Sequence, residues 1–205
     1  MTVTTPLPLL LRRRMTPLAR TLFTLALSLN PDENMLFLFS SRHGDYARTY
    51  GMLNTLAEEN SLSAAEFSLS VHNALCGLLS IALQNRHGHV AISAGRDTFG
   101  CALMESALLL QENPTRSILL VHYDAPLPEV YHALCGEDER TLVVAFTIQA
   151  PHPGRPRILL DWLPAQASPD CQPSPSPAHD FLSFLQSEGG IGQARGDRMV
   201  WRWRS

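Results

Sequence analysis

Short apolar runs alternate along the chain with longer segments in which apolar residues recur every three or four positions. The short runs predict strands, at 35–39, 89–93, 117–123 and 141–149. The longer segments predict helices, at 17–29, 44–59, 72–84 and 99–111. Strand, helix and strand in succession build parallel sheets that carry helices on their faces. The pattern therefore predicts an α/β fold in which helices pack on the faces of a mixed sheet.

The pattern changes after residue 150. Segments 151–156 and 164–177 are rich in proline, and the second is also rich in serine, so both are typical of connections at the surface. A short helix is predicted at 178–187, and the tail over 198–204 alternates arginine with apolar residues, as an edge strand does. The predicted organisation is a leader and helix (1–34), an α/β domain (35–150), and a Pro-rich connection plus C-terminal helix and strand of the same domain (151–205).

Composition removes several function classes. At 205 residues and 45% hydrophobic content, the chain is large enough for one main core. All 16 basic residues are arginine, which excludes a P-loop lysine, a Schiff-base lysine and a lysine general base. The net charge of −3 gives no basic field for nucleic acid. The alternation of arginine and tryptophan in the tail leaves a nucleic-acid or membrane contact as an alternative for that segment.

The cysteines are widely spaced and form no C-x-x-C pair; they are Cys76, Cys101, Cys135 and Cys171. Such spacing is typical neither of a zinc site nor of a disulfide framework, and it favours a reduced, cytoplasmic compartment.

The N-terminal region has some features of an export signal, because arginines at 12–14 precede an apolar stretch at 18–29. Arg20 interrupts that stretch, and no small-residue cleavage site follows it. An amphipathic helix capped by Thr16, with Pro17 in its first turn, is the better interpretation. No apolar run is long enough to span a membrane.

The order of motifs over 63–123 is the most specific feature. It consists of Ser-Val-x-Asn at 70–73, Gly77, Ser-Ile at 80–81, and then a strand, a turn and a helix over 89–111. This order resembles the N-terminal half of the β-ketoacyl synthases, over about residues 35–150. Ser-Arg-His-Gly at 41–44 and Tyr-Asp at 123–124 fit the same half. The resemblance implies a thiolase-like half-fold.

In that family, the turn between strand and helix carries the acyl-accepting cysteine, and here that position falls at about Arg96, within a residue or so. Arginine is a permanent cation at the positive end of the helix dipole, and it cannot attack a thioester. Asp97 and Thr98 are good N-cap and first-turn residues, so the helix start is well formed. The His-Gly-Thr sequence of the family's second half does not occur after residue 150. We therefore expect a maintained turn without catalytic chemistry.

This combination resembles a shortened chain-length factor, the non-catalytic partner of an active ketosynthase in iterative polyketide and polyene assembly. The resemblance implies a heterodimer with a full-length synthase, indirect contact with acyl carrier protein, and no cofactor, metal, nucleic acid or membrane span. In the family, one strand pairs antiparallel across the dimer axis, and the segment before Ser-Val-x-Asn walls the partner's acyl tunnel. The residues carried over are Val90, Ala91, Ile92 and Ser93 for the interface strand, and Ala65, Glu66, Phe67 and Ser70 for the tunnel wall.

A half-fold would leave one sheet edge and one apolar face open unless a partner covers them. Three alternatives to this interpretation stay open. Phe67 is equally well explained as a core residue. A small acyltransferase or thioesterase would use Cys101 or a serine as its nucleophile. A scaffold homodimer would keep the synthase fold only as a relic.

Overall fold

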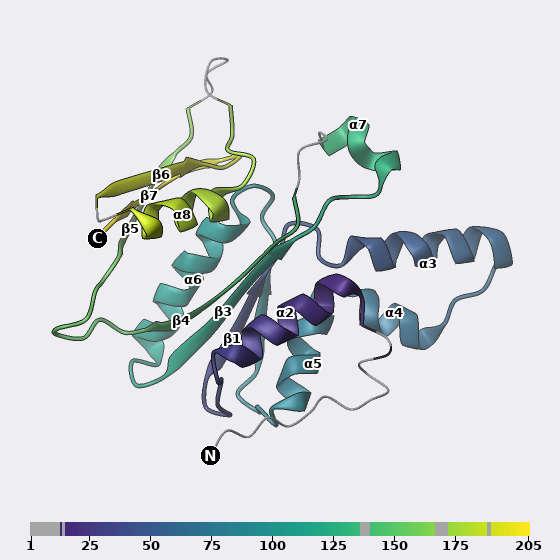
Figure 1. Ribbon diagram of the computed structural model, residues 1–205, viewed down its shortest axis with the longest axis horizontal. Helices are drawn as coiled ribbons and strands as arrows, with labels where there is room; N and C mark the ends of the chain where they lie inside the picture. The colour runs from purple at the N-terminus through teal and green to yellow at the C-terminus, as the bar shows by residue number, and fades with distance from the viewer. Residues whose placement is uncertain (1–12, 14, 136–139, 167–171, 188–189) are drawn as a thin grey trace.

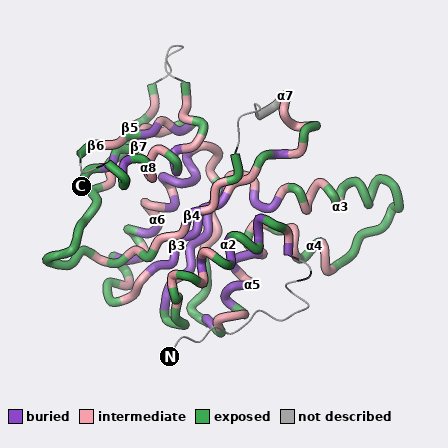
Figure 2. Tube along the Cα trace, viewed as in Figure 1, coloured by how far each residue is buried: buried purple, intermediate pink, exposed green. Residues whose placement is uncertain are grey.

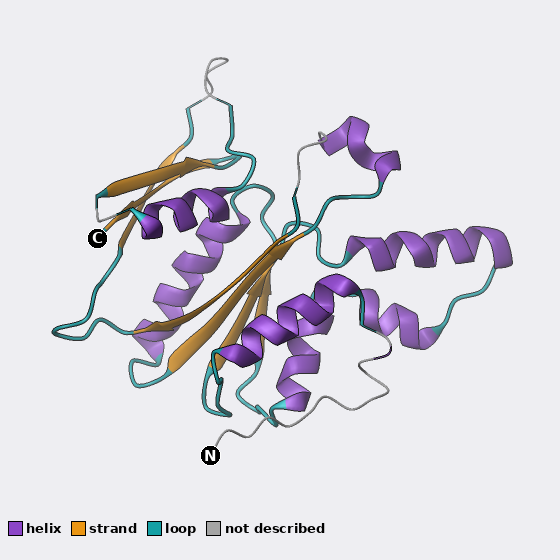
Figure 3. Cartoon of the chain, viewed as in Figure 1, coloured by secondary structure: helices purple, strands orange, loops and turns teal. Residues whose placement is uncertain are grey.

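The computed structural model describes residues 13, 15–135, 140–166, 172–187 and 190–205. Its centre is a four-stranded sheet in the order β2-β1-β3-β4 (Figures 1 and 3). The strands are β1 (Leu36–Ser40), β2 (His89–Ile92), β3 (Ser117–Asp124) and β4 (Leu142–Gln149). β1 is parallel to β2 and β3, whereas β4 is antiparallel to β3. The predicted mixed sheet with helices on its faces is confirmed.

Two helices cover one face of the sheet and two cover the other. They are α2 (Pro17–Ser28) and α5 (Ala74–Ala82) on the first face, and α6 (Thr98–Glu112) and α8 (Pro177–Gln186) on the second. Successive strand residues point to opposite faces, so Phe37 and Phe39 join the first core and Leu38 joins the second. Thr16 caps α2 as predicted, since its hydroxyl accepts a hydrogen bond from the Ala19 amide at 3.2 Å.

A helical arm projects from this body (Figures 1 and 2). It consists of α3 (Tyr46–Glu59) and α4 (Ala64–Ser70), and α3 has no buried residue. The rings of Tyr46 and Tyr50 pack edge-on against Tyr131, next to the short helices η1 (Glu129–Tyr131) and α7 (His132–Cys135). Leu53 and Leu56 continue this apolar face of α3 and are 43% and 38% exposed. Part of the apolar face therefore has no cover within the described chain.

The C-terminal third forms a second sheet, which the sequence did not predict in full. Its strands are β5 (Leu159–Pro164), β6 (Ile191–Arg195) and β7 (Met199–Arg204), paired antiparallel in the order β5-β7-β6. The tail was expected to be an edge strand, but β7 is the central strand. The alternation of arginine with apolar residues predicts that one face of the strand is buried. Whether the strand lies at the edge or in the centre of its sheet depends on pairing partners elsewhere in the chain. Trp201 and Trp203 are each 1% exposed, so neither is placed for a surface contact.

The predicted strand at 89–93 is present as β2 and is only partly buried. β2 is an edge of the main sheet, with His89 exposed and Val90, Ala91 and Ile92 half-buried. Its free edge leaves backbone N–H and C=O groups that can pair with another strand. Among the described residues, no single helix is long and apolar enough to cross a membrane; α4 and α5, bent by 98°, pass that test together by length and composition alone.

Candidate functional site at the turn between β2 and α6

The turn between β2 and α6 is closed by the first residue of the helix. The Thr98 hydroxyl accepts a hydrogen bond from the Ala94 amide at 2.8 Å and donates one to the Gly95 carbonyl at 2.7 Å. Thr98 is 2% exposed, so these bonds lie away from water. The well-formed helix start that the sequence predicts is present, but Thr98 rather than Asp97 makes the local contacts.

Asp97 faces the C-terminal strand instead of capping α6. Its carboxylate accepts hydrogen bonds from the Arg198 amide at 2.8 Å, the Met199 amide at 3.3 Å and the Trp201 indole N–H at 2.9 Å. No side-chain capping bond is formed. Asp97 thus stands at the N-cap position of α6, but its side chain does not cap the helix, because three donors from the far end of the chain bind its carboxylate.

Two glycines allow the C-terminal hairpin to approach the turn closely. A Cβ atom on Gly100 would lie 2.1 Å from the Trp201 ring, and one on Gly196 would lie 1.9 Å from an Asp97 carboxylate oxygen. The indole therefore sits directly on the first turn of α6. This packing closes the space over the turn with the chain's own C-terminal residues.

Arg96, at the position that the resemblance assigns to the nucleophile, is bound by a carboxylate from the same hairpin. Its amide donates to Asp197 Oδ2 at 2.8 Å, and its guanidinium Nη1 lies 3.3 Å from Asp197 Oδ1. Burial raises the pKa of Asp197, but the hydrogen bonds and charge of Arg96, together with the charge of Arg42, outweigh this and hold the pKa below its ordinary value. The backbone N–H of residue 96 is thus already occupied.

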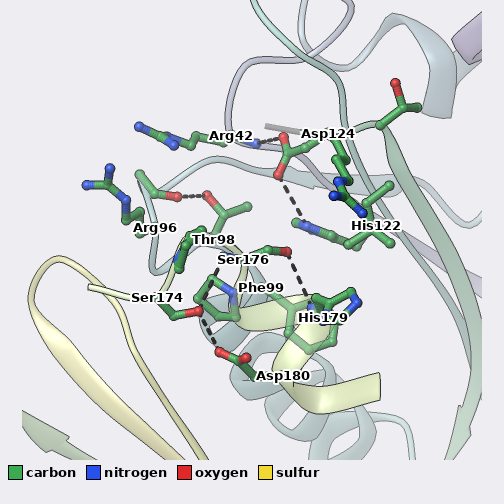
Figure 4. Close-up of a pocket in the computed structure, with 16 residues that line it drawn as sticks. Arg42, Arg96, Thr98, Phe99, His122, Asp124, Ser174, Ser176, His179 and Asp180 are labelled. Atoms are coloured by element: carbon green, nitrogen blue, oxygen red, sulfur yellow. Dashed lines mark hydrogen bonds and ion pairs between the residues drawn. The ribbon is translucent and has the colours of Figure 1, made fainter. Parts of the chain in front are cut away.

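A pocket of about 480 Å³ adjoins the turn, where β1 and β3 reach their carboxyl ends (Figure 4). Ligands of open α/β sheets bind at this edge. Its charged and ionisable lining residues are Arg42, Arg96 and Arg140, His122 and His179, and Asp124 and Asp180. The pocket thus mixes both signs of charge. Its nearby hydroxyls are engaged, since Ser174 donates to the Asp180 carboxylate and Ser176 accepts from the His179 amide.

Below the pocket, a serine, a histidine and an aspartate form a buried array. Ser40 Oγ lies 3.0 Å from His122 Nδ1, and His122 Nε2 lies 3.3 Å from Asp124 Oδ2. Asp124 Oδ1 also accepts from the Ser41 hydroxyl at 3.1 Å and the Arg42 amide at 2.7 Å. Ser40 is fully buried and does not line the pocket, so its hydroxyl cannot meet a substrate there.

Sequence reasoning missed this array, because residues 40 and 122 are 82 positions apart and only the pairing of β1 with β3 joins them. The signal that existed was the pair of segments 41–44 and 123–124, which the structure brings together at Asp124. Burial raises the pKa of Asp124, but the hydrogen bond and charge of His122 and the bonds from Arg42 and Ser41 keep it below its ordinary value.

The two cysteines whose side chains are described are poor nucleophiles. Burial raises the pKa of Cys76, which is fully buried. Burial and the nearby charge of Asp97 raise the pKa of the half-buried Cys101. Cys171 and the side chain of Cys135 lie outside the described residues. Within the described part of the chain, no three His, Cys, Asp or Glu residues are grouped to hold a metal ion.

The predicted partner-contacting residues lie on β2 and α4, both of which contact α5. Val90, Ala91 and Ile92 belong to the edge strand β2, and Ser93 follows it; Ala65, Glu66, Phe67 and Ser70 all belong to α4. Ser93 donates to the Arg42 carbonyl at 2.9 Å, and Glu66 forms an ion pair with Arg48. Phe67 is 55% exposed, so the alternative interpretation of Phe67 as a core residue was wrong.

Comparison with known proteins places this geometry in a family. A family model, beta-ketoacyl synthase, N-terminal domain, matches residues 2–204. A solved structure of a ketosynthase (ApeO) in complex with its chain length factor (ApeC), from Xenorhabdus doucetiae, contains a similar chain with a TM-score of 0.80. That chain is 25% identical, and the match covers 100% of this protein and 83% of its relative. A comparison with curated proteins found no match. The chain therefore has the thiolase-like half-fold of the ketosynthases and belongs to the β-ketoacyl synthase N-terminal-domain family.

Proposed function

We propose that this protein is a non-catalytic, chain-length-factor-like subunit. It pairs with an active β-ketoacyl synthase and helps to shape that enzyme's acyl tunnel in iterative polyketide or polyene biosynthesis. The observation that carries the proposal is the set of contacts that Arg96 makes in the turn between β2 and α6. Its amide and its guanidinium both contact Asp197, so this position offers neither a thiol nor a free backbone N–H.

The solved relative supports the choice of partner, since its structure holds a ketosynthase together with a chain length factor. On this basis the partner is a full-length ketosynthase, and acyl carrier protein is met indirectly through that enzyme. The three-part organisation over 1–34, 35–150 and 151–205 remains a prediction. A cytoplasmic location is part of the same proposal.

The free edge of β2 supports the interface. An unpaired edge strand with half-buried Val90 and Ile92 is suited to antiparallel pairing with a strand of another chain. Large apolar side chains are exposed on the adjoining α4–α5 segment, namely Phe67 at 55%, Val71 at 42% and Ile81 at 71%. Obligate interfaces bury about 2,000 Å² or more and are rich in apolar residues. The edge and these side chains together supply such a surface.

Phe67 is the residue proposed to limit the length of the partner's cavity. It projects from α4 and is 55% exposed among the described residues, whereas the neighbouring Glu66 is held by Arg48. A bulky ring placed at the end of a tunnel shortens it by about its own length and excludes further extension units. Chain length is then controlled by shape, without chemistry by this subunit.

Co-expression with a full-length, cysteine-containing ketosynthase of the same organism, followed by size-exclusion chromatography, tests the pairing. We expect a 1:1 complex that Ile81→Asp weakens. Leu108→Asp is the matched control, because Leu108 is 49% exposed on α6, across the sheet from α5. A folded monomer that captures no synthase would end the proposal. A stable homodimer without a synthase would instead favour the scaffold alternative.

The acyltransferase or thioesterase alternative has no support at Cys101 or at Ser40. Cys101 has a raised pKa, and Ser40 is fully buried. Labelling of the purified chain by a thioester-derived acyl probe that Cys101→Ala abolishes would reinstate this alternative.

A further inference from the structure

The sheet β5-β7-β6 has two faces of different character, which the register of its strands defines. Three rows of cross-strand neighbours face away from the core. They are Leu159–Arg204–Ile191, Asp161–Arg202–Gln193 and Leu163–Val200–Arg195. These nine residues are called the outer face. The inner face contributes Trp201, Trp203 and Ala194 to the core with α6 and α8.

The outer face is uncovered. In Figure 1, α8 lies on the inner side of the sheet, and no described helix or strand lies on its other side. Ile191 is 77% exposed, Leu159 47% and Leu163 41%. Solvated sheet faces are ordinarily polar, because side chains alternate between a buried and a hydrated side. Three exposed aliphatic side chains on a face of nine residues are therefore unusual and indicate a contact surface.

The same face is basic. Arg202 and Arg204 stand at the centre of two rows, and neither forms an ion pair among the described residues. Arg195 is anchored, since its guanidinium donates to the Gln166 carbonyl at 2.6 Å. Asp161 is the single acidic residue of the face, and its carboxylate accepts a hydrogen bond from the Trp162 amide. Arg204 thus lies between the aliphatic Leu159 and Ile191, whereas Arg202 lies between Asp161 and Gln193. With three arginines against one aspartate, the outer face is positively charged.

We propose that the outer face binds an acidic amphipathic helix of a partner protein. The three strands span about 10 Å across the sheet, which matches the width of one helix. Five residues along a strand span about 13 Å, which matches the length of two to three helical turns. Leu159, Leu163 and Ile191 would contact the helix's apolar stripe. Arg202 and Arg204 would pair with carboxylates beside that stripe.

Two other occupants fit the observations less well. A second copy of this chain, joined by the same face, would bring Arg202 and Arg204 against their own counterparts, because a two-fold interface is self-complementary. An anionic membrane is attracted in proportion to the number of basic residues, and two free arginines give little attraction. Trp201 and Trp203, which would anchor at a lipid interface, are buried instead.

This surface is separate from the proposed synthase contacts. The C-terminal sheet and the α3–α4 arm, which carries Phe67, lie at opposite ends of the molecule in Figure 1. The inference therefore stands or falls independently of the pairing with a synthase.

Fluorescence anisotropy with the full chain tests the proposal. The probe is a labelled synthetic amphipathic helix of about 18 residues, with leucines on one face and glutamates beside them; the control peptide carries lysine at each glutamate position. We expect the acidic peptide to bind, and the lysine peptide to bind at least about ten-fold more weakly. The double variant Arg202→Glu with Arg204→Glu, and Ile191→Asp separately, should each weaken the acidic peptide by about ten-fold or more. Arg20→Glu, on the exposed side of α2, should leave binding unchanged.

The outcomes are distinct. All substituted side chains are exposed, so unchanged thermal melting of the variants separates lost binding from lost folding. Equal affinity for both peptides, or no binding of either, overturns the proposal. Binding to vesicles with 30% anionic lipid, lost in the arginine variant and without peptide binding, would assign the face to a membrane and also overturn it. Concentration-dependent dimerisation that Ile191→Asp abolishes would assign it to a second copy.

Discussion

The indole N–H of Trp201 donates to the carboxylate of Asp97 at 2.9 Å, across 104 positions of sequence. The same ring lies on Gly100, where no side chain intervenes. Asp97 and Gly100 bracket the first turn of α6, so the C-terminal strand is fixed to the turn that carries Arg96. The turn is held in shape by this contact and is covered by it at the same time.

Gly100→Ala should destabilise the protein, because the added methyl group would lie 2.1 Å from the Trp201 ring and the indole cannot move out of a packed core without strain. We expect a loss of about 1–3 kcal/mol in the free energy of unfolding, measured by urea denaturation. Gly51→Ala is the matched control. Gly51 lies within α3 with nothing within 4 Å of the added methyl, so the change should be neutral or stabilising by up to about 1 kcal/mol. Equal effects of the two substitutions would contradict the role of the indole.

Asp97→Ala should be more damaging than removal of an exposed carboxylate. It would leave the Arg198 amide and the buried Trp201 indole N–H without their acceptor, and the loss at the indole alone costs about 1–3 kcal/mol. Asp97→Asn keeps one acceptor oxygen and should be milder. Glu58→Ala, on the exposed α3, should change stability by less than about 0.5 kcal/mol. A wild-type-like urea midpoint for Asp97→Ala would contradict the anchoring role.

Asp124 should make stability dependent on acid pH. Its pKa in the folded protein lies below the ordinary value of 3.8, so its contribution is fully present above that value and is lost as the pH falls through the folded pKa. The free energy of unfolding should therefore decline below about pH 4. Asp124→Asn should be less stable at neutral pH and should show a shallower decline between about pH 4 and pH 2. An unchanged acid profile would show that the bonds to His122, Ser41 and Arg42 do not stabilise the charged form.

Cys101 should react slowly with alkylating agents at neutral pH. Its pKa lies above the ordinary value of 9.0, and the thiolate is the reactive species. Peptide mass mapping after iodoacetamide treatment should show modification of Cys101 in the native protein rising only above about pH 9. The unfolded chain, as control, should be modified at lower pH. Rapid native labelling at neutral pH would point to an activated thiol.

Phe67→Ala should change the product of the complex and leave the stability of this chain unchanged. The ring is 55% exposed here, so its loss removes little packing within the chain. If Phe67 closes the partner's tunnel, the smaller side chain lengthens the cavity, and product analysis by mass spectrometry should show longer chains. Leu62→Ala, at 45% exposure before α4, is the control and should leave the product length unchanged. Identical products from wild type and Phe67→Ala would remove Phe67 from the tunnel wall.

Much of the main α/β unit follows from local pattern. The predicted helix at 17–29 is observed as Pro17–Ser28, and the predicted strand at 117–123 as Ser117–Asp124. Ser63 caps α4 through a bond from the Glu66 amide, as its position before an apolar run indicates. Caps and periodicity are determined by residues within a turn or two of each other, so the sequence displays them directly.

The C-terminal third was harder to predict because its elements depend on distant partners. β5 lies between two proline-rich segments and was not predicted, since its residues become a strand only by pairing with β7. Gly192 makes room for Phe184, because a Cβ atom on Gly192 would lie 2.8 Å from the Phe184 Cβ. A glycine that a distant side chain requires looks the same in sequence as one that a turn requires.

The sequence by itself determined the order of strands and helices in the main α/β unit, the family, and the presence of arginine where the resemblance expects a thiol. These depend on residue identity and on short-range spacing. Only the tertiary structure decided that Asp197 holds Arg96, that Asp97 faces β7, that Ser40 meets His122, and that β2 is left at an edge. Each of these features depends on residues from separate parts of the chain. Such residues meet only when the sheet packs against its helices and the C-terminal hairpin.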